Sequence, residues 1–260
     1  MAQSSQVFES LETRRLLSVS VTSNGMLKVV GEAESANTIY VAYNDATAMY
    51  DVTLNGTTQS FDAASVRRLR ISGGDEADTI SVANSVKVRV QINGNDGDDI
   101  LSAGSKRSAI NGGEGNDLIT GSAKSDTLRG GNGNDTINAG AGDDQVNGGD
   151  GDDVLNAGAG DNEVFGGDGA DTITALDGDD LIVGGDGKDS IDAGTGDDDV
   201  SQDTPVPDVE NCAGGRVGMG RFGSNGRQAG DDEGTRERPD ARGVLASGGR
   251  AGLFGEMSIR

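Results

Sequence analysis

The chain has 260 residues, of which 44 are glycine and 3 % are aromatic, and its formal net charge at pH 7 is -23. So few bulky apolar side chains exclude a conventional large hydrophobic core. The lack of histidine and the single cysteine, Cys212, exclude Ser-His-Asp catalysis, Cys-His catalysis and a disulfide within the chain.

The negative charge is concentrated in the middle of the chain. Acidic and basic residues number 10 and 8 in residues 1–93, 25 and 5 in residues 94–201, and 9 and 8 in residues 202–260. Such a middle segment repels nucleic acid and attracts cations, so we expect no nucleic-acid partner. No stretch approaches the roughly 18 apolar residues of a membrane span, so we expect none.

Residues 8–18 read FESLETRRLLS. This stretch resembles the LEPR-XLL signature near the start of bacterial surface and exported proteins, with Thr13 where that signature has proline. The resemblance implies that residues 1–18 are an export or surface-type segment.

Residues 19–93 contain short β-branched or aromatic runs separated by turn residues, which predicts a small strand-rich region. The runs are VSVTS, MLKVV, TIYVAY, MYDVTL, TTQSF, VRRLRI and VKVRVQI. Asn24-Gly25 and Asn55-Gly56 each lie between two runs. Asn-Gly suits a two-residue type I′ hairpin, because both central residues take positive φ, so we expect a hairpin of this type at each pair.

Residues 94–201 divide into twelve consecutive nonapeptides of the form G-G-x-G-x-D-x-U-x, where U is aliphatic. Units that begin with Gly-Gly alternate with units that do not, so the full structural repeat is a pair of unlike nonapeptides. The eighth position is aliphatic in all twelve units, which a disordered acidic tract does not explain: Leu101, Ile110, Ile119, Leu128, Ile137, Val146, Leu155, Val164, Ile173, Ile182, Ile191 and Val200.

Each unit predicts a turn followed by a very short strand. The glycines let the backbone turn sharply and leave carbonyl oxygens uncovered, and the strand points U inward. Two units then close one coil of a flattened parallel β-solenoid, also called a β-roll. The predicted fold class is therefore all-β.

Coil stacking places the sixth residues of the units in two columns, one on each edge. The first column holds Asp99, Asp117, Asp135, Asp153, Asp171 and Asp189, and the second holds Ser108, Asp126, Asp144, Asn162, Asp180 and Asp198. Stacked carboxylates repel one another, and Ca²⁺, which accepts six to eight oxygens, would turn that repulsion into attraction.

We therefore predict several calcium ions, about eight or nine, from five intervals in the first column and about four in the second. The ligands would be the ten column aspartates and glycines of the Gly-Gly units: Gly112, Gly113, Gly115, Gly130, Gly131, Gly133, Gly148, Gly149, Gly151, Gly166, Gly167, Gly169, Gly184, Gly185 and Gly187. Lys106, Arg107 and Ser108 replace glycine and aspartate in one unit, so we expect no full site there.

The nonapeptides resemble the RTX (repeats-in-toxin, hemolysin-type calcium-binding) family over residues 94–201, with a degenerate copy, GGDEADTIS, at residues 73–81. The resemblance implies a parallel β-roll with calcium between its turns. It also implies a chain that is unfolded in calcium-poor cytosol and folds outside the cell, so the expected location is extracellular or at the cell surface.

From Gln202 the repeat stops, and residues 202–260 form a Gly/Arg-rich tail that we expect to be disordered. The expected organisation is thus residues 1–18, 19–93, 94–201 and 202–260. The favoured function is calcium binding without catalysis, with a cell-surface or extracellular matrix partner left open. The alternative is an accessory calcium-binding part of an exported protease, lipase or polysaccharide-modifying enzyme.

Overall fold

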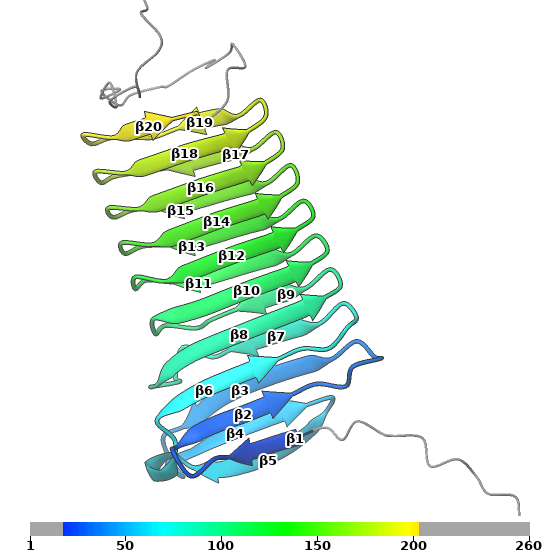
Figure 1. Ribbon diagram of the computed structural model, residues 1–260. Coiled ribbons are helices and arrows are strands. Elements are labelled where there is room, and N and C mark those ends of the chain that lie inside the picture. The colour runs from blue at the N-terminus through cyan, green and yellow to red at the C-terminus, as the bar shows by residue number, and fades with distance from the viewer. Residues whose placement is uncertain (1–17, 203–260) are drawn as a thin grey trace, which may run out of the picture. The chain divides into compact units, whose positions relative to one another are not determined.

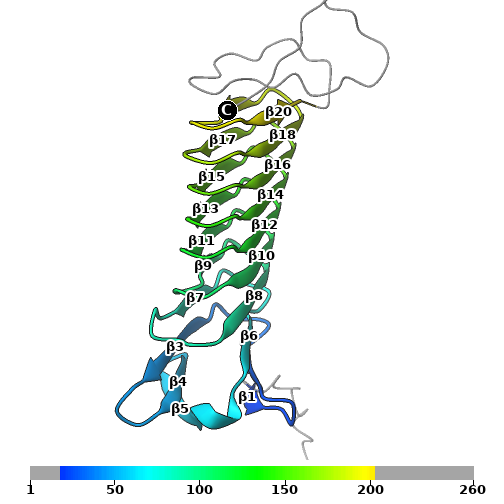
Figure 2. The ribbon, with the colours of Figure 1, turned by 90° about the vertical axis from the view of Figure 1, so that its left-hand side faces the viewer.

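The computed structural model describes residues 18–202, which form two ten-stranded sheets lying face to face (Figures 1 and 2). In spatial order, sheet A contains β1 (Ser18–Val21), β2 (Met26–Val30), β6 (Arg68–Ser72), β8 (Arg89–Asp96), β10 (Ser108–Glu114), β12 (Thr127–Asn132), β14 (Gln145–Asp150), β16 (Glu163–Asp168), β18 (Leu181–Asp186) and β20 (Asp199–Ser201). Sheet B contains β19 (Ser190–Asp192), β17 (Thr172–Ala175), β15 (Val154–Gly158), β13 (Thr136–Gly140), β11 (Leu118–Ser122), β9 (Ile100–Ser102), β7 (Thr79–Val82), β3 (Thr38–Asn44), β4 (Met49–Leu54) and β5 (Thr57–Asp62).

From β8 to β20 the chain alternates between the two sheets, and each strand pairs in parallel with the next strand of its own sheet, two nonapeptides further along. In sheet A, for example, Ile110 lies opposite Leu128, and in sheet B Ile119 lies opposite Ile137. One strand from each sheet makes a coil, and the coils stack along the solenoid (Figure 1). The predicted all-β fold class, a parallel β-solenoid, is confirmed.

The core is the thin layer between the two sheets. It contains the aliphatic residue at the eighth position of each nonapeptide, and eleven of the twelve are at most 3 % exposed. The twelfth, Val200, belongs to the last strand and is only partly buried, because no further coil covers it. Inward alternation along each short strand therefore gives this glycine-rich segment a continuous core.

The strands predicted for residues 19–93 join the same two sheets. Strands β2 and β6 pair in parallel in sheet A, and β3 and β7 do so in sheet B, so the coil stack begins before Gly94. Leu69 lies opposite Val90, so the coil between them is longer than the later coils, which all contain two nonapeptides. The antiparallel pairs of the described residues, β1 with β2, β3 with β4 and β4 with β5, lie at the N-terminal end of the stack.

The two Asn-Gly pairs form different turns. Asn55 and Gly56 both have positive φ, 48° and 79°, and join the antiparallel strands β4 and β5, so the two-residue turn predicted there is confirmed. The same prediction for Asn24-Gly25 is wrong. Only Gly25 has positive φ there (77°), and the Thr22 amide donates to the Met26 carbonyl across a longer loop, a common alternative hairpin.

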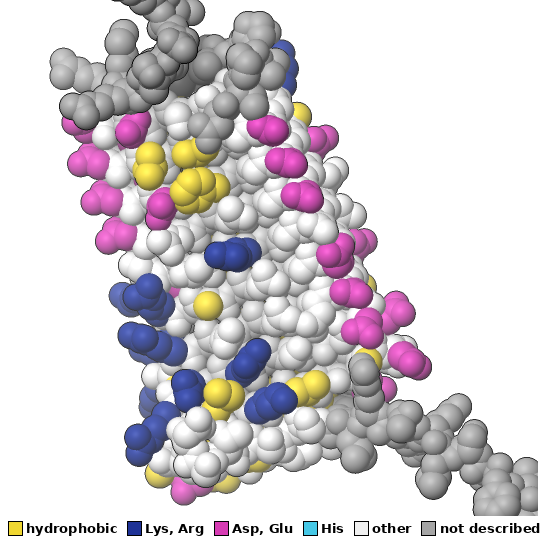
Figure 3. Space-filling view, in the orientation of Figure 1, with side chains coloured by type: hydrophobic (Ala, Val, Ile, Leu, Met, Phe, Trp, Pro, Cys, Tyr) yellow, Lys and Arg dark blue, Asp and Glu magenta, His cyan; other side chains and the backbone are white. Residues whose placement is uncertain are grey.

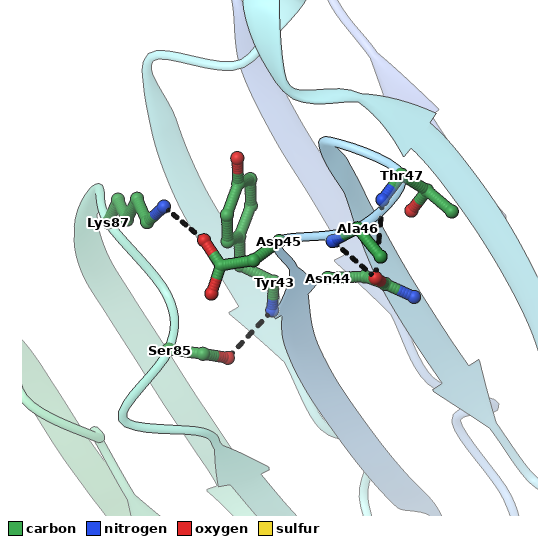
Figure 4. A network of polar contacts seen from close by, with 7 residues as sticks. All are labelled: Tyr43, Asn44, Asp45, Ala46, Thr47, Ser85 and Lys87. Atoms are coloured by element: carbon green, nitrogen blue, oxygen red, sulfur yellow. Dashed lines mark hydrogen bonds and ion pairs between the residues drawn. The ribbon is translucent and has the colours of Figure 1, made fainter.

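A small polar network ties the N-terminal loops together (Figure 4). Lys87 Nζ lies 2.7 Å from Asp45 Oδ1 and 3.8 Å from the centre of the Tyr43 ring. The Tyr43 amide donates to Ser85 Oγ at 3.0 Å. These contacts connect the loop after β3 to the loop between β7 and β8, and so fix the start of the coil stack.

The described segment contains one helical element, the short 3₁₀ helix η1 (Ala63–Ser65). Within residues 18–202 no helix is long and apolar enough to cross a membrane. The export-type signature in residues 8–18, apart from Ser18, and the tail predicted to be disordered, apart from Gln202, lie outside the described residues.

Candidate metal centre

The predicted columns of polar side chains exist, and they are buried. Each member lies directly before a strand or at its start and is at most 5 % exposed. The first column is Asp99, Asp117, Asp135, Asp153, Asp171 and Asp189, and the second is Ser108, Asp126, Asp144, Asn162, Asp180 and Asp198. Both columns follow the coil stack, because the parallel register repeats with every second nonapeptide.

One oxygen of each column carboxylate holds two coils together. Asp135 donates its backbone N–H to Asp153 Oδ1 at 2.7 Å, and the same bond recurs along the first column at 2.7 to 3.0 Å. The second column repeats it at 2.6 to 3.0 Å. The Oδ1 atoms of both columns are therefore satisfied by the preceding coil.

The other carboxylate oxygen has no protein donor at nine of these aspartates. The nine buried Oδ2 atoms without a hydrogen-bond partner belong to Asp99, Asp117, Asp135, Asp144, Asp153, Asp171, Asp180, Asp189 and Asp198. A buried charged acceptor without a partner is strongly unfavourable, and native proteins contain few of them. Cations bound along the two columns would satisfy these nine oxygens.

The first glycine of each Gly-Gly unit lies against the free Oδ2 of its own first-column aspartate, and its lack of a side chain is structurally required. Gly130 lies so close to Asp135 Oδ2 that an added Cβ would overlap this oxygen, and the first glycines of the other Gly-Gly units lie in the same way against their own aspartates. These glycines are Gly112, Gly148, Gly166 and Gly184.

The second and fourth glycines of each Gly-Gly unit meet the preceding coil. Gly131 and Gly133 have φ of 132° and 118°, and an added Cβ would overlap the carbonyl oxygens of Gly113 and Gly115. Positive φ recurs at the other predicted glycines in these positions, which are Gly113, Gly115, Gly149, Gly151, Gly167, Gly169, Gly185 and Gly187. The turns therefore stack with each glycine against the backbone of the preceding coil.

Burial changes the electrostatics of the columns. Desolvation, together with the charge of neighbouring carboxylates, raises the pKa of Asp117 and Asp153 to about 7. Desolvation raises the pKa of Asp99, Asp135, Asp144 and Asp171 to about 6, and that of Asp180 above its usual value. Backbone hydrogen bonds oppose these shifts without cancelling them. The ionised columns are therefore unstable without positive charge.

The donor set is oxygen only. Residues 18–202 contain no group of three or more His, Cys, Asp or Glu side chains that could hold a metal ion by themselves. A cation at the free Oδ2 atoms therefore has to take carbonyl oxygens from the turns as well. Carboxylate and carbonyl oxygens in a flexible turn suit Ca²⁺, which accepts six to eight such ligands.

Asp126 and Asn162 differ from the other members of the second column. Asp126 Oδ2 accepts the Ser122 amide at 2.7 Å, and its Oδ1 accepts both the amide and the hydroxyl of Ser108. Asn162 donates its side-chain amide to the Gly160 carbonyl at 2.8 Å. Protein donors here occupy oxygens that stay free for a cation elsewhere.

The first column extends further toward the N-terminus than the sequence indicated. Asp78 donates its N–H to Asp99 Oδ1, and Asn37 donates its N–H to Asp78 Oδ1. Asp78 is the sixth residue of the degenerate copy at 73–81, so the nonapeptide pattern could have placed it. Nothing in the sequence indicated Asn37, because 41 residues separate it from Asp78.

The family comparison agrees with this geometry. The model of the RTX calcium-binding nonapeptide repeat, which holds four copies, matches residues 91–107, 111–146, 129–164, 138–173, 147–182 and 165–200. No curated protein and no solved structure matches the chain. With buried aspartate columns at each turn and a matching family model, residues 91–200 of this chain are RTX calcium-binding nonapeptide repeats.

Proposed function

We propose that residues 94–201 bind several calcium ions and fold on binding them, in a protein that works outside the cell or at its surface. The observation that carries the proposal is the set of nine buried Oδ2 atoms without a hydrogen-bond partner. Their donor chemistry is that of calcium sites, because carboxylate and carbonyl oxygens surround each turn.

The proposed ligands are the nine aspartates with a free Oδ2, together with carbonyl oxygens of the glycine-rich turns. Asp126 is the weakest of the ten predicted aspartates in this role, because both of its oxygens already accept protein donors. We keep eight or nine ions as the proposed number and expect the first column, with six free Oδ2 atoms, to bind the more tightly.

Folding on calcium binding follows from the charge. Residues 94–201 carry 25 acidic and 5 basic side chains, a net charge of -20 that opposes compaction in the metal-free chain. Because the turns come together only in the folded chain, the free energy of binding becomes free energy of folding. Calcium affinities near 10⁻⁴ to 10⁻³ M, typical of extracellular modules, would keep the segment unfolded inside the cell.

We propose a binding and folding module without catalysis. The column carboxylates are at most 5 % exposed, so a substrate cannot reach them. A pair of catalytic carboxyls needs a cleft that a substrate can enter, whereas these aspartates are buried between the coils. An associated enzyme domain, for which this module would be the accessory part, remains the alternative, and activity assays on alginate, lipid ester and casein test it.

The test of the main proposal is far-UV circular dichroism of the metal-free protein titrated with calcium from micromolar to millimolar concentrations. The expected result is a cooperative gain of β-sheet signal with calcium and none with magnesium. A signal that does not change, or that changes equally with magnesium, would contradict the proposal.

A further inference from the structure

An exposed row of charged residues runs along one edge of the solenoid, one residue before the second column. Its members follow one another strand by strand through sheet A: Arg68, Arg89, Arg107, Ser125, Asp143, Asp161, Asp179 and Asp197. We call them the charge row. The seven charged members are exposed.

The charge row has opposite signs at its two ends. Its first three members are arginines, Ser125 is neutral, and its last four are aspartates. In Figure 3 this is the left-hand edge, where basic side chains gather along the lower part and acidic ones along the upper part. Lys106 and Lys124, each one residue before a member of the row, add to the basic part.

The signs reverse about Ser125. Arg107 and Asp143 are each one coil from Ser125, and Arg89 and Asp161 are each two coils from it. Arg68 and Asp179 are each three coils away. Because one coil rise of about 4.8 Å sets every step, the basic and acidic halves have the same spacing.

Neither half is balanced by ion pairs among the described residues. Arg68 and Arg89 are direct cross-strand partners, and like charges in that position are destabilising. Among the described residues Lys87 pairs with Asp45, and none of the three arginines of the row forms an ion pair with a described acidic side chain. The described part of the chain therefore presents one basic and one acidic stretch, which follow one another along the edge.

Hydrogen bonds between successive coils connect the members of the acidic half. The amides of Asp161, Asp179 and Asp197 donate to Oδ1 of the aspartate one coil earlier, at 3.2, 2.9 and 2.9 Å. These bonds fix the carboxylates at coil spacing. A binding surface ordered in advance loses less side-chain entropy on association.

We propose that this edge binds a second copy of the same chain, with the two solenoids antiparallel about a two-fold axis near Ser125. Arg68, Arg89 and Arg107 of one copy then face Asp179, Asp161 and Asp143 of the other, and the two-fold axis repeats these three pairs. A two-fold interface has to be complementary to itself, which is the property of the charge row. An anionic polymer would fit the basic half only.

The first experiment measures the molar mass of the calcium-saturated full chain by sedimentation equilibrium at low and high salt. We expect a dimer whose dissociation constant rises at least about tenfold between roughly 0.05 and 0.5 M salt, because exposed ion pairs are screened. A monomer at every salt concentration, or a dimer that salt does not weaken, overturns the proposal.

Charge reversal tests the basic half. The variant R68E/R89E/R107E makes every charged member of the row acidic, so we expect its dissociation constant to rise at least about 100-fold. An unchanged dimer contradicts the proposal. If the wild type is a monomer that binds heparin and this variant is not retained, the basic half instead recognises an anionic polymer.

The complementary variant, D143K/D161K/D179K, makes every charged member of the row except Asp197 basic and is also expected to be a monomer. Mixing the two variants places opposite charges face to face again, so the mixture should form a heterodimer within about tenfold of the wild-type dissociation constant. Recovery on mixing also shows that both variants are folded. Two monomeric variants that stay monomeric when mixed overturn the proposal.

The matched control is D150K/D168K/D186K. These exposed aspartates are direct neighbours at the other ends of the sheet A strands, and their reversal changes the net charge by the same amount. The dimer should keep its wild-type dissociation constant. An equal weakening would indicate a general charge effect and contradict a specific charge row. All mixtures contain saturating calcium, so a failure of calcium-dependent folding appears separately, in circular dichroism.

Discussion

At the scale of single residues, the aspartates of the two columns differ in how many of their oxygens already have a protein donor. Nine have a free Oδ2, whereas both oxygens of Asp126 accept N–H groups. The Ser122 amide donates to Asp126 Oδ2 at 2.7 Å, whereas Asp135 Oδ2 has no protein donor.

Asp153 and Asp198 differ in the number of coils that they connect. Asp153 Oδ1 accepts the Asp135 amide while its own amide donates to Asp171, whereas Asp198 lies at the end and accepts from Asp180 alone. Substituting Asp153 with alanine should therefore raise the calcium midpoint more than substituting Asp198, as measured by circular dichroism titration. Equal shifts would contradict stacked, coupled sites.

Asn162 offers a test in the opposite direction. Its side-chain amide occupies the Gly160 carbonyl, so N162D would free that carbonyl and add a carboxylate to the second column. We expect a calcium midpoint lower by about twofold or more, since ligand charge tunes calcium affinity. N138D adds the same charge on the exposed face of β13 and should leave the midpoint unchanged.

At the scale of strands and turns, each coil is stabilised by an aliphatic core residue in each strand and by the hydrogen bonds of its turns. Leu155 is 1 % exposed between the sheets, while its neighbour Val154 is 48 % exposed on the outer face of β15. In saturating calcium, L155A should lower the free energy of unfolding by about 2–5 kcal/mol. V154A should change it by about 0.5 kcal/mol or less. Chemical denaturation measures both, and similar losses would contradict the inward alternation.

At the scale of the whole solenoid, the two ends of the stack differ in their dependence on cations. At the N-terminal end, Asn37 donates its side-chain amide to the carbonyls of Glu32 and Ser35, and both oxygens of Asp78 accept N–H groups. Residues 1–93 are also nearly neutral, with 10 acidic and 8 basic side chains. At this end protein N–H groups therefore satisfy the side-chain oxygens, whereas cations would satisfy the free Oδ2 atoms of the later coils.

We therefore expect residues 26–92 to stay folded in the metal-free protein while residues 94–201 unfold. Hydrogen exchange in the presence of a calcium chelator should show protected amides in the first range and fast exchange in the second. After calcium is added back, protection should return in the second range. Uniform protection across both ranges, or uniform loss, would contradict a metal-independent N-terminal end.

The raised pKa values predict how pH acts on the metal-free solenoid. With pKa values of about 6 to 7 in the folded chain against 3.8 normally, the folded state binds more protons between about pH 4 and pH 7. Its stability therefore falls as pH rises through this window. In chelator, the β-sheet signal should be larger at pH 5 than at pH 8, and the calcium midpoint should fall as pH rises. A metal-free signal that grows with pH would contradict this linkage.

The sequence by itself determined the period, the inward residues and the two aspartate columns. A parallel repeat of two nonapeptides leaves little freedom, because alternation along so short a strand decides which side chains are buried, as Ile137 and Ala139 of β13 show. The turn at Asn55-Gly56 was also predictable, since both residues adopt positive φ locally. These features depend on local geometry repeated in register.

Only the tertiary structure decided the features that depend on contacts between distant residues. It placed β2, β3, β6 and β7 in the solenoid and made Asn37 the end of the first column, 41 residues from its neighbour Asp78. It also brought Arg68 into line with Asp197. The early coils differ in length, so a fixed sequence period cannot predict their strand pairing. The register of these strands depends instead on which side chains the two sheets can bury together.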